Sequence, residues 1–239
     1  MIAFATQPVL ALHEYDFPGI GSRSDWSKAH KLFLQAILTR KNSSHISRDQ
    51  SMDAIKKAIR IYPQDPSFYC ELAEEHLDCR RYSEAFEAVK QALELHPNFG
   101  RAYYEQAQIF LKQAYNDEAL QPLETSATLT PNDPDVWLAL GVYREEPGSV
   151  GSPEDAYIKC LKLVGCRRKL SPFNDTAESY RVLCFQNLGT LRLGQKRYAE
   201  AKTFYHQAFV SDTKHQFTDR LRGEIDYCEK SISNSLSKI

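Results

Sequence analysis

A 34-residue period through the middle of the chain constrains its fold more than any other feature. Aromatic side chains recur at Tyr69, Tyr103 and Trp137, and prolines keep the same step at 63, 97 and 131. Small residues also keep it, at 58, 92, 126 and 160. A fixed period of this length is typical of a solenoid, in which each unit buries its apolar face only by stacking on a neighbour.

Each repeat unit is predicted to be a pair of antiparallel helices. In residues 66–99, Pro66 suits the first turn of a helix, and Tyr69 and Leu72 then fall on one helical face. A second helix is expected from about Ser83, with three alanines on its inner face, and Pro97 ends it. Small alanine side chains allow two helices to approach closely, so the unit is interpreted as a helical hairpin.

The same plan divides the chain into five hairpins, flanked by two other segments. The units are predicted near 32–65, 66–99, 100–133, 134–167 and 182–215, within a repeat domain of residues 26–215. Residues 216–239 are predicted to form a capping helix. Residues 1–25 are predicted to be irregular, and three alternatives stay open for the first dozen residues: packing into a groove, covering an end of the array, or disorder.

Local irregularities interrupt this plan at three places. Residues 41–50 are predicted to be an exposed connection, and residues 165–174 a loop that breaks the register. After that loop, an extended first helix is expected from about Asn174. Pro122 lies inside a predicted second helix, where it must fall in the first turn or bend the helix.

Composition and charge exclude several classes of function. The formal net charge is −1 and the pI is about 6.7, so no global field attracts nucleic acid or an anionic membrane. No apolar run approaches the ~20 residues of a membrane span, and no basic leader precedes the mildly apolar start. The six cysteines form no Cys-x-x-Cys pair and are interpreted as reduced, mostly buried thiols. We therefore expect a cytoplasmic protein without membrane insertion.

Residue patterns that carry chemistry are missing from the sequence. No glycine-rich phosphate loop and no His-Glu-x-x-His motif occurs. His76 and Cys79 are three residues apart on one predicted helix, so a metal site is conceivable, but His76 is better explained as a core ring. We therefore expect no enzyme activity, no catalytic residue, no metal site and no cofactor.

The repeat pattern resembles the tetratricopeptide repeat, whose signature spaces aromatic, Leu-Gly, Ala and Pro positions over 34 residues. The matching residues are Tyr69, Leu72, Ala73, Ala85, Ala92, Pro97, Trp137, Leu140, Gly141, Leu188, Gly189, Ala201, Tyr205 and Ala208. The resemblance implies an all-α fold: a right-handed α–α superhelix of about four to five hairpins plus a C-terminal capping helix. It also implies a concave groove, lined by the first helix of each hairpin, that binds a protein or peptide partner.

Carried onto this sequence, the resemblance places the following residues in the groove: Glu71, Glu74, Asp78, Arg101, Tyr104, Glu105, Gln108, Lys112, Asp135, Leu138, Val142, Gln186 and Asn187. Over all the first-helix positions of this kind, acidic residues outnumber basic ones by seven to two. A like-charged anionic tail is disfavoured there, so we expect a partner with basic residues along an apolar or helical spine. The alternative is that these carboxylates only solvate the face.

Two functions follow from these expectations. The first is an adaptor or scaffold that binds a partner protein through the groove. The second is a structural subunit that self-associates or holds a larger complex together. RNA binding is disfavoured because it calls for a 35-residue step and a basic concave face, so no nucleic acid partner is expected.

Overall fold

The computed structural model describes residues 21–40, 45–146, 149, 151–167 and 174–236, and every regular element within them is an α-helix. In chain order the helices are α1 (Arg23–Arg40), α2 (His45–Ile61), α3 (Pro66–Asp78), α4 (Tyr82–Leu95), α5 (Gly100–Lys112), α6 (Asn116–Leu129), α7 (Pro134–Arg144), α8 (Pro153–Arg167), α9 (Asn174–Gly194), α10 (Tyr198–Ser211) and α11 (Thr218–Leu236). The chain divides into two compact units, Met1–Pro131 and Asn132–Ile239.

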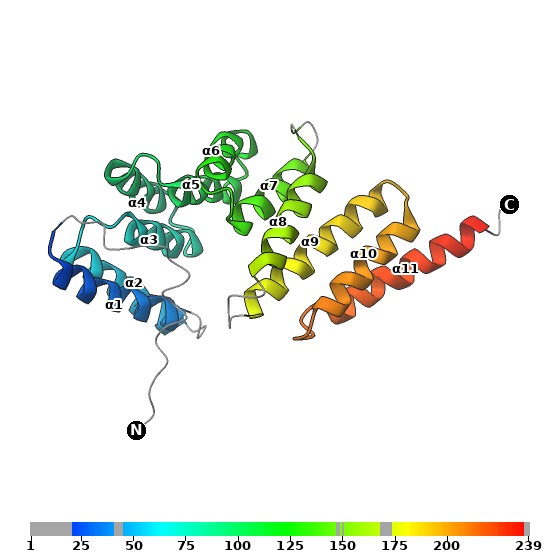
Figure 1. The fold of residues 1–239 in the computed structure, drawn as a ribbon, viewed down its shortest axis with the longest axis horizontal. Helices are drawn as coiled ribbons and strands as arrows, with labels where there is room; N and C mark the ends of the chain where they lie inside the picture. Colours follow the sequence, from blue (N-terminus) through cyan, green and yellow to red (C-terminus); the bar gives the residue numbers. More distant parts are fainter. Residues whose placement is uncertain (1–20, 41–44, 147–148, 150, 168–173, 237–239) are drawn as a thin grey trace, which may run out of the picture. The chain divides into compact units, whose positions relative to one another are not determined.

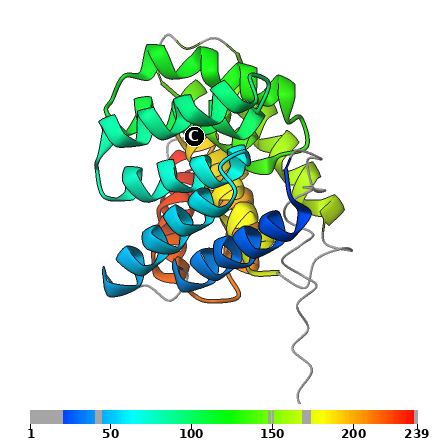
Figure 2. The ribbon, with the colours of Figure 1, turned by 90° about the vertical axis from the view of Figure 1, so that its left-hand side faces the viewer.

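Consecutive helices pack as hairpins within each unit. In the first unit α1 pairs with α2, α3 with α4, and α5 with α6; the pair α1 and α2 lie side by side in both Figure 1 and Figure 2. In the second unit α7 pairs with α8 and α9 with α10, and α11 packs on α10. The predicted all-α fold of helical hairpins is confirmed over the described residues.

Large and small side chains interlock across two of the hairpins. Gly141 on α7 leaves room for the ring of Tyr157 on α8, and a Cβ at 141 would collide with that ring. Gly189 on α9 does the same for Tyr205 on α10, where an added Cβ would lie 2.8 Å from the ring. Both pairs are 16 residues apart in the sequence, and both tyrosines are buried. The glycine is therefore required by the ring that packs against it.

The turns inside three hairpins share one backbone geometry. Arg80, Ala114 and Lys196 have positive φ angles of 57°, 62° and 59°, although none is a glycine. After each, the next residue donates its N–H back to a carbonyl five residues earlier, for example from Arg81 to the oxygen of His76 at 2.8 Å. This left-handed residue followed by a long backbone hydrogen bond satisfies a carbonyl at the end of the first helix. The period is thus visible in the backbone as well as in the core.

Several predicted boundaries move in the structure. Helix α2 already begins at His45, so most of the predicted connection 41–50 is helical, and α8 continues to Arg167 into the predicted loop 165–174. Pro122 is buried in α6, which begins at Asn116, so it lies beyond the first turn. The extended helix from Asn174 is confirmed as α9. The predictions for residues 1–20, 41–44 and 168–173 lie outside the described residues.

The final helix has the amphipathic character expected of a cap. Leu221, Ile225 and Cys228 are buried in a cluster with α10 residues. The connection before it is organised by Asp212, whose carboxylate accepts hydrogen bonds from the backbone N–H groups of Gln216 at 3.0 Å and Phe217 at 2.8 Å. Burial opposes ionisation of Asp212, but these hydrogen bonds lower its pKa on balance.

Two further properties of the described residues bear on function. No helix among them is long and apolar enough to cross a membrane. The cysteines at 70, 79, 160, 184 and 228 are free thiols, and four of these five are buried.

Candidate partner-binding face

Helices α3 and α5, the first helices of two successive hairpins, pack against each other and carry most of the predicted site residues of the first unit. Arg101 on α5 lies between three carboxylates. Its Nη2 is 2.8 Å from Glu71 Oε2 and 3.2 Å from Glu74 Oε2, and its Nε is 3.5 Å from Glu105 Oε1. The structure thus brings four of the thirteen predicted residues into direct contact, with carboxylates in excess. We call the surface around this cluster the α3/α5 face.

Burial differs sharply among the three carboxylates. The Glu71 and Glu105 side chains are only 2% and 5% exposed, whereas the Glu74 side chain is 33% exposed. Two of the predicted groove carboxylates therefore lie beneath Arg101 instead of facing solvent. Glu74 is the member of the cluster that a partner can reach.

Glu105 is the carboxyl group most affected by this environment. Burial raises its pKa, the negative charges of Glu74 and Glu71 raise it further, and the guanidinium of Arg101 only partly opposes them. The result is a pKa of about 8. Glu105 is therefore mostly protonated at pH 7, and the face becomes more acidic as the pH rises through 8.

The remaining predicted residues of this unit surround the cluster. Asp78 at the end of α3 and Lys112 at the end of α5 are exposed, and Tyr104 and Gln108 on α5 are half-buried. The solvent-accessible charges of the face are thus two carboxylates and two cations, above a buried pair of carboxyl groups. The face is less acidic at neutral pH than a count of first-helix residues predicts.

The predicted residues of the second unit lie on α7 and α9. Asp135 accepts a hydrogen bond of 2.5 Å from the hydroxyl of Tyr180, which ties α7 to α9. Leu138 is half-buried, and Val142 is 50% exposed. This surface is therefore mainly apolar on α7, and its one predicted carboxylate is already engaged.

The two predicted amides on α9 are occupied by contacts inside the second unit. Gln186 is buried, and its side-chain oxygen, when turned toward Arg220 on α11, accepts from Nη2 and Nη1 at 3.1 and 3.2 Å. Asn187 donates to the hydroxyl of Tyr157 at 3.2 Å. The Tyr157 hydroxyl in turn donates to Glu145 at 2.6 Å. These amides hold the helices together more than they present themselves to a ligand.

Sequence reasoning missed Tyr180 and Arg220 as partners of predicted site residues. Tyr180 lies on the extended part of α9 before the repeat register resumes, and Arg220 lies on the final helix. Neither belongs to the 34-residue pattern, so the period carried no signal for them. Tyr157, by contrast, lies in the repeat register. Its 16-residue spacing from Gly141 is the signal that identifies Gly141 as the residue its ring packs against.

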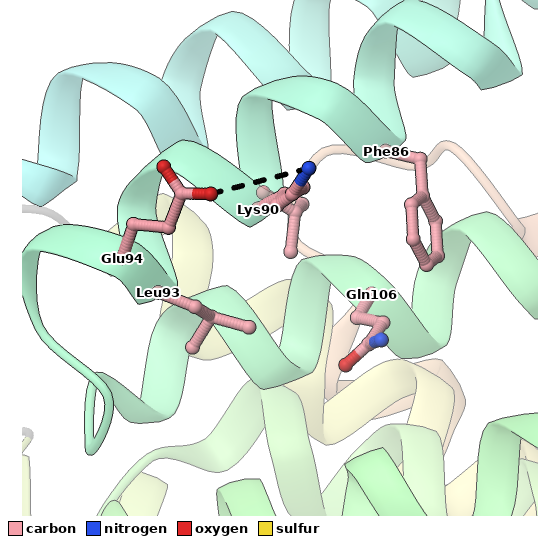
Figure 3. A pocket seen from close by; sticks show the side chains of 6 residues that line it. Phe86, Lys90, Leu93, Glu94 and Gln106 are labelled. Atoms are coloured by element: carbon pink, nitrogen blue, oxygen red, sulfur yellow. Dashed lines mark ion pairs between the residues drawn. The ribbon is translucent and has the colours of Figure 1, made fainter.

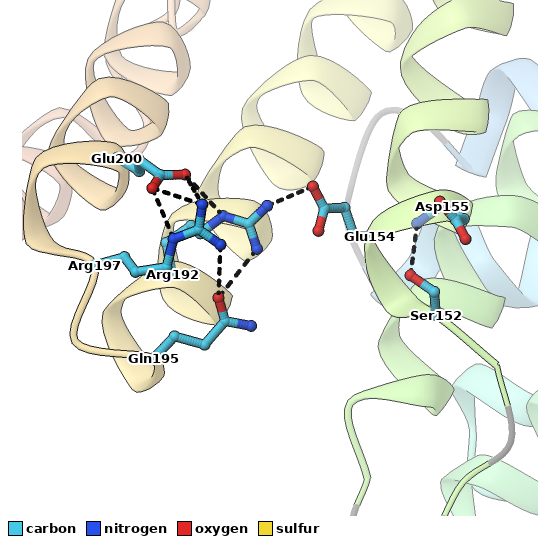
Figure 4. Close-up of polar contacts among 7 residues, drawn as sticks. All are labelled: Ser152, Glu154, Asp155, Arg192, Gln195, Arg197 and Glu200. Atoms are coloured by element: carbon cyan, nitrogen blue, oxygen red, sulfur yellow. Dashed lines mark hydrogen bonds and ion pairs between the residues drawn. The ribbon is translucent and has the colours of Figure 1, made fainter.

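A second polar cluster lies at the turns of the second unit, away from the predicted residues (Figure 4). Arg192 on α9 is 7% exposed; it donates to Glu154 at the start of α8 and lies 3.3 Å from Glu200 on α10. The exposed Arg197 also pairs with Glu200, at 2.7 Å. The two arginines and two glutamates of this cluster pair with one another across three helices. We therefore interpret the cluster as part of the packing of the second unit.

The histidine considered for metal binding is part of the core. His76 is buried on α3, and burial together with the positive charges of Arg81 and Lys56 lowers its pKa. Its ring is therefore neutral at pH 7. Among the described residues, no group of three or more His, Cys, Asp or Glu side chains is placed to hold a metal ion.

Comparison with known proteins agrees with the fold. Residues 66–99 match the sequence model of the family described as tetratricopeptide repeat, which confirms the resemblance noted above for this repeat. Similar solved structures include TTC0263, a thermophilic tetratricopeptide-repeat protein of Thermus thermophilus, with 18% identity, a TM-score of 0.61, and coverage of 84% of this chain and 98% of that one.

Two more solved structures share the fold. PilF of Pseudomonas aeruginosa has 15% identity, a TM-score of 0.61, and coverage of 89% of this chain and 93% of that one. MamA has 18% identity, a TM-score of 0.53, and coverage of 70% of this chain and 90% of that one. At these identities the likeness concerns the fold alone. No curated protein sequence matches the chain.

Proposed function

We propose that this protein, which carries a tetratricopeptide repeat at residues 66–99 and has the fold of tetratricopeptide-repeat proteins, is a non-catalytic adaptor that binds a basic partner segment on its α3/α5 face. The observation that carries the proposal is the cluster in which three carboxyl groups share one guanidinium, that of Arg101, so that carboxyl groups are in excess within the cluster and Glu74 is the one that a partner can reach. A partner cation is the group that balances this excess.

The partner's cation has a defined place to interact. Glu74 is the accessible carboxylate of the cluster, and Asp78 lies one helical turn further along α3. The half-buried ring of Tyr104 on the neighbouring helix α5 offers a flat apolar contact on the same face. A lysine or arginine followed by an apolar residue fits this arrangement, whereas an acidic tail meets like charge.

Binding of a cation is expected to be coupled to release of a proton. A positive charge beside the cluster stabilises the ionised form of Glu105, whose pKa is about 8 before binding. The partner therefore lowers that pKa and binds more tightly as the pH rises from 7 to 9. This pH dependence distinguishes the α3/α5 face from other acidic surfaces of the protein.

The proposal is tested by fluorescence anisotropy with a labelled basic amphipathic peptide and a peptide of the same apolar pattern with acidic residues. The double variant Glu74→Gln/Asp78→Asn is expected to weaken the basic peptide about tenfold, since each accessible carboxylate supplies on the order of 0.5–1 kcal/mol. The matched control is Glu94→Gln, an exposed carboxylate on α4. Equal affinity for both peptides, or equal loss in the control, contradicts the proposal.

A second candidate function, self-association, is favoured by apolar side chains exposed on the second unit. Val210 at the end of α10 is 76% exposed, and Tyr227 on α11 is 54% exposed. Light scattering after size exclusion separates the two functions. A monomer at micromolar concentration favours the adaptor, and a dimer that Tyr227→Glu dissociates favours the structural subunit.

A reducing compartment such as the cytoplasm is also part of the proposed function. It is supported by the five free cysteines among the described residues. Alkylation in denaturant directly on lysis, followed by mass spectrometry, tests it: all cysteines are expected to be alkylated without prior reduction, and disulfides that react only after reduction contradict it.

A further inference from the structure

Two apolar hollows flank helix α4 in the first unit. One, of about 350 Å³, lies between α3 and α4 and is lined by Tyr69, Leu72, Ser83, Glu84, Glu87, Ala88 and Gln91. The other, of about 300 Å³, lies between α4 and α5 and is lined by Phe86, Val89, Lys90, Leu93, Glu94 and Gln106. Figure 3 shows Phe86 and Leu93 facing this second hollow, with the Lys90–Glu94 ion pair at its rim. The walls of both are mostly carbon.

The second hollow has an amide side chain at a repeat position where the neighbouring repeats have leucine. Gln106 is 34 residues after Leu72 and 34 before Leu140, so the neighbouring repeats place a leucine where this one has an amide. Leu140 is buried in its own unit, whereas Gln106 is only half-buried. Phe86 beside it remains 36% exposed. Leu72, the equivalent residue of the preceding repeat, is also half-buried and lines the first hollow. Apolar surface is therefore exposed on both sides of α4, and such a surface is typical of a binding site.

This surface is separate from the α3/α5 face. Gln106 lies five residues after Arg101 and two before Gln108 on α5, which places it about 140° and 200° away around the helix. An occupant beside α4 therefore leaves the proposed partner-binding residues uncovered.

We propose that the occupant is the N-terminal segment of the same chain, with residues 1–12 lying along α4 over the two hollows. These twelve residues contain no charged side chain and include Ile2, Phe4, Val9, Leu10 and Leu12. An uncharged apolar segment is chemically matched to carbon-lined walls. A polar or basic partner is not.

Gly21, the first described residue, lies next to the connection between α2 and α3. A Cβ on Gly21 would lie 3.3 Å from the Tyr62 ring and 3.7 Å from Gln64. This connection also contacts the first hollow, because the carbonyl of Pro63 accepts a hydrogen bond of 3.0 Å from the hydroxyl of Tyr69, which lines that hollow. Gly21, from which the segment extends, therefore lies beside the same connection that contacts a residue of the first hollow.

Length and tethering also favour this occupant over a second molecule. Twenty residues reach up to about 66 Å when extended, and α4 with its fourteen residues is only about 21 Å long. A segment tethered this closely has an effective concentration of about a millimolar, well above the micromolar concentration of a free partner. The intramolecular contact is thus favoured when the intrinsic affinities are similar.

The test uses the full chain with a photo-crosslinking benzoylphenylalanine at position 4 in place of Phe4. Irradiation is expected to give crosslinks within one chain to the α3–α5 peptides that line the hollows, identified by mass spectrometry in the monomer band. Crosslinks spread over the second unit overturn the proposal. So does a crosslinked dimer band, which shows a second copy in the hollow, or the absence of any crosslink to protein.

Two further variants connect the crosslinks to the hollows. Phe86→Glu is expected to lower the crosslink yield by about tenfold or more, because a carboxylate disfavours an apolar contact. Gln106→Leu introduces the leucine of the neighbouring repeats and makes the wall of the second hollow more apolar; it is expected to raise the crosslink yield without lowering Tm. Yields unchanged in both variants overturn the proposal, whatever the yield of the parent chain.

Discussion

The buried carboxyl group of Glu105 makes the stability of the first unit depend on pH in a calculable way. The variant Glu105→Gln replaces a protonated carboxyl group with an amide of nearly the same shape that cannot ionise. At pH 7 Glu105 is mostly protonated because its pKa is about 8, so this change removes little negative charge from the folded protein. At pH 9 it removes a negative charge that is buried beside Glu71 and Glu74.

The sign of the effect follows from proton linkage. The pKa of Glu105 is raised in the folded state, from an ordinary value of 4.5 to about 8. The folded protein therefore binds this proton more tightly than the unfolded chain, so the stabilisation is complete below pH 4.5 and is lost as the pH rises through 8.

The magnitude follows from the same two values. Each unit of pKa difference corresponds to about 1.4 kcal/mol, so the full contribution is on the order of 5 kcal/mol. About half of it is lost between pH 5 and pH 7, and roughly a quarter more between pH 7 and pH 9. The Glu105→Gln variant lacks this loss of stability with rising pH.

The assay is urea unfolding of both proteins, followed by circular dichroism at pH 5, 7 and 9. The difference between their free energies of unfolding cancels the titration of groups that do not interact with Glu105, so it reports on Glu105 together with the carboxyl groups of Glu71 and Glu74. We expect Glu105→Gln to gain stability relative to the parent by about 3–4 kcal/mol over this pH range. The matched control is Glu94→Gln, at an exposed carboxylate on α4, and its stability relative to the parent is expected not to change with pH. A difference that stays constant with pH refutes the burial argument for Glu105.

Three other substitutions, two of them paired with a control variant, test how the hairpins are built. The quantity measured in each case is the change in the free energy of unfolding. Gly141→Ala drives a methyl group into the Tyr157 ring and is expected to destabilise by about 1–3 kcal/mol, whereas Gly223→Ala, in open space on α11, should stabilise by up to about 1 kcal/mol. Arg192→Met should cost about 1–3 kcal/mol because it strips two carboxylates of their buried partner, while the exposed Arg197→Met should cost less than about 1 kcal/mol. Ala114→Gly should stabilise by about 0.5–1 kcal/mol because Ala114 has a φ of 62°. Opposite signs in any of these comparisons contradict the packing or backbone described.

Much of the fold is predictable from the sequence because the period acts through packing. Ala85, Ala92 and Leu140 are each fully or almost fully buried, as their positions in the repeat predict. The extended helix at Asn174 was also predictable, since the register resumes only after it. The helical conformation of residues 45–50, within the predicted connection 41–50, was not predictable, because their polar side chains break no rule for an exposed helix and carry no repeat signal.

The candidate site was less predictable than the fold, for a physical reason. A repeat position defines which way a side chain points within its own hairpin, but the burial of Glu71 and Glu105 depends on Arg101, which joins two successive hairpins. Pairing between successive hairpins depends on charged side chains whose positions the 34-residue period does not specify. An arginine and glutamates at first-helix positions of adjacent repeats are the signal that identifies such a pair.

The most direct test of the central claim is the number of protons released when the basic amphipathic peptide binds at pH 8, measured by titration calorimetry in two buffers of different ionisation enthalpy. We expect release of a substantial fraction of one proton, approaching one half, because the pKa of Glu105 is about 8 and a bound cation lowers it. Glu105→Gln is expected to bind the peptide with almost no proton release. Absence of binding, or the same release in both proteins, contradicts the assignment of the partner-binding site to the α3/α5 face.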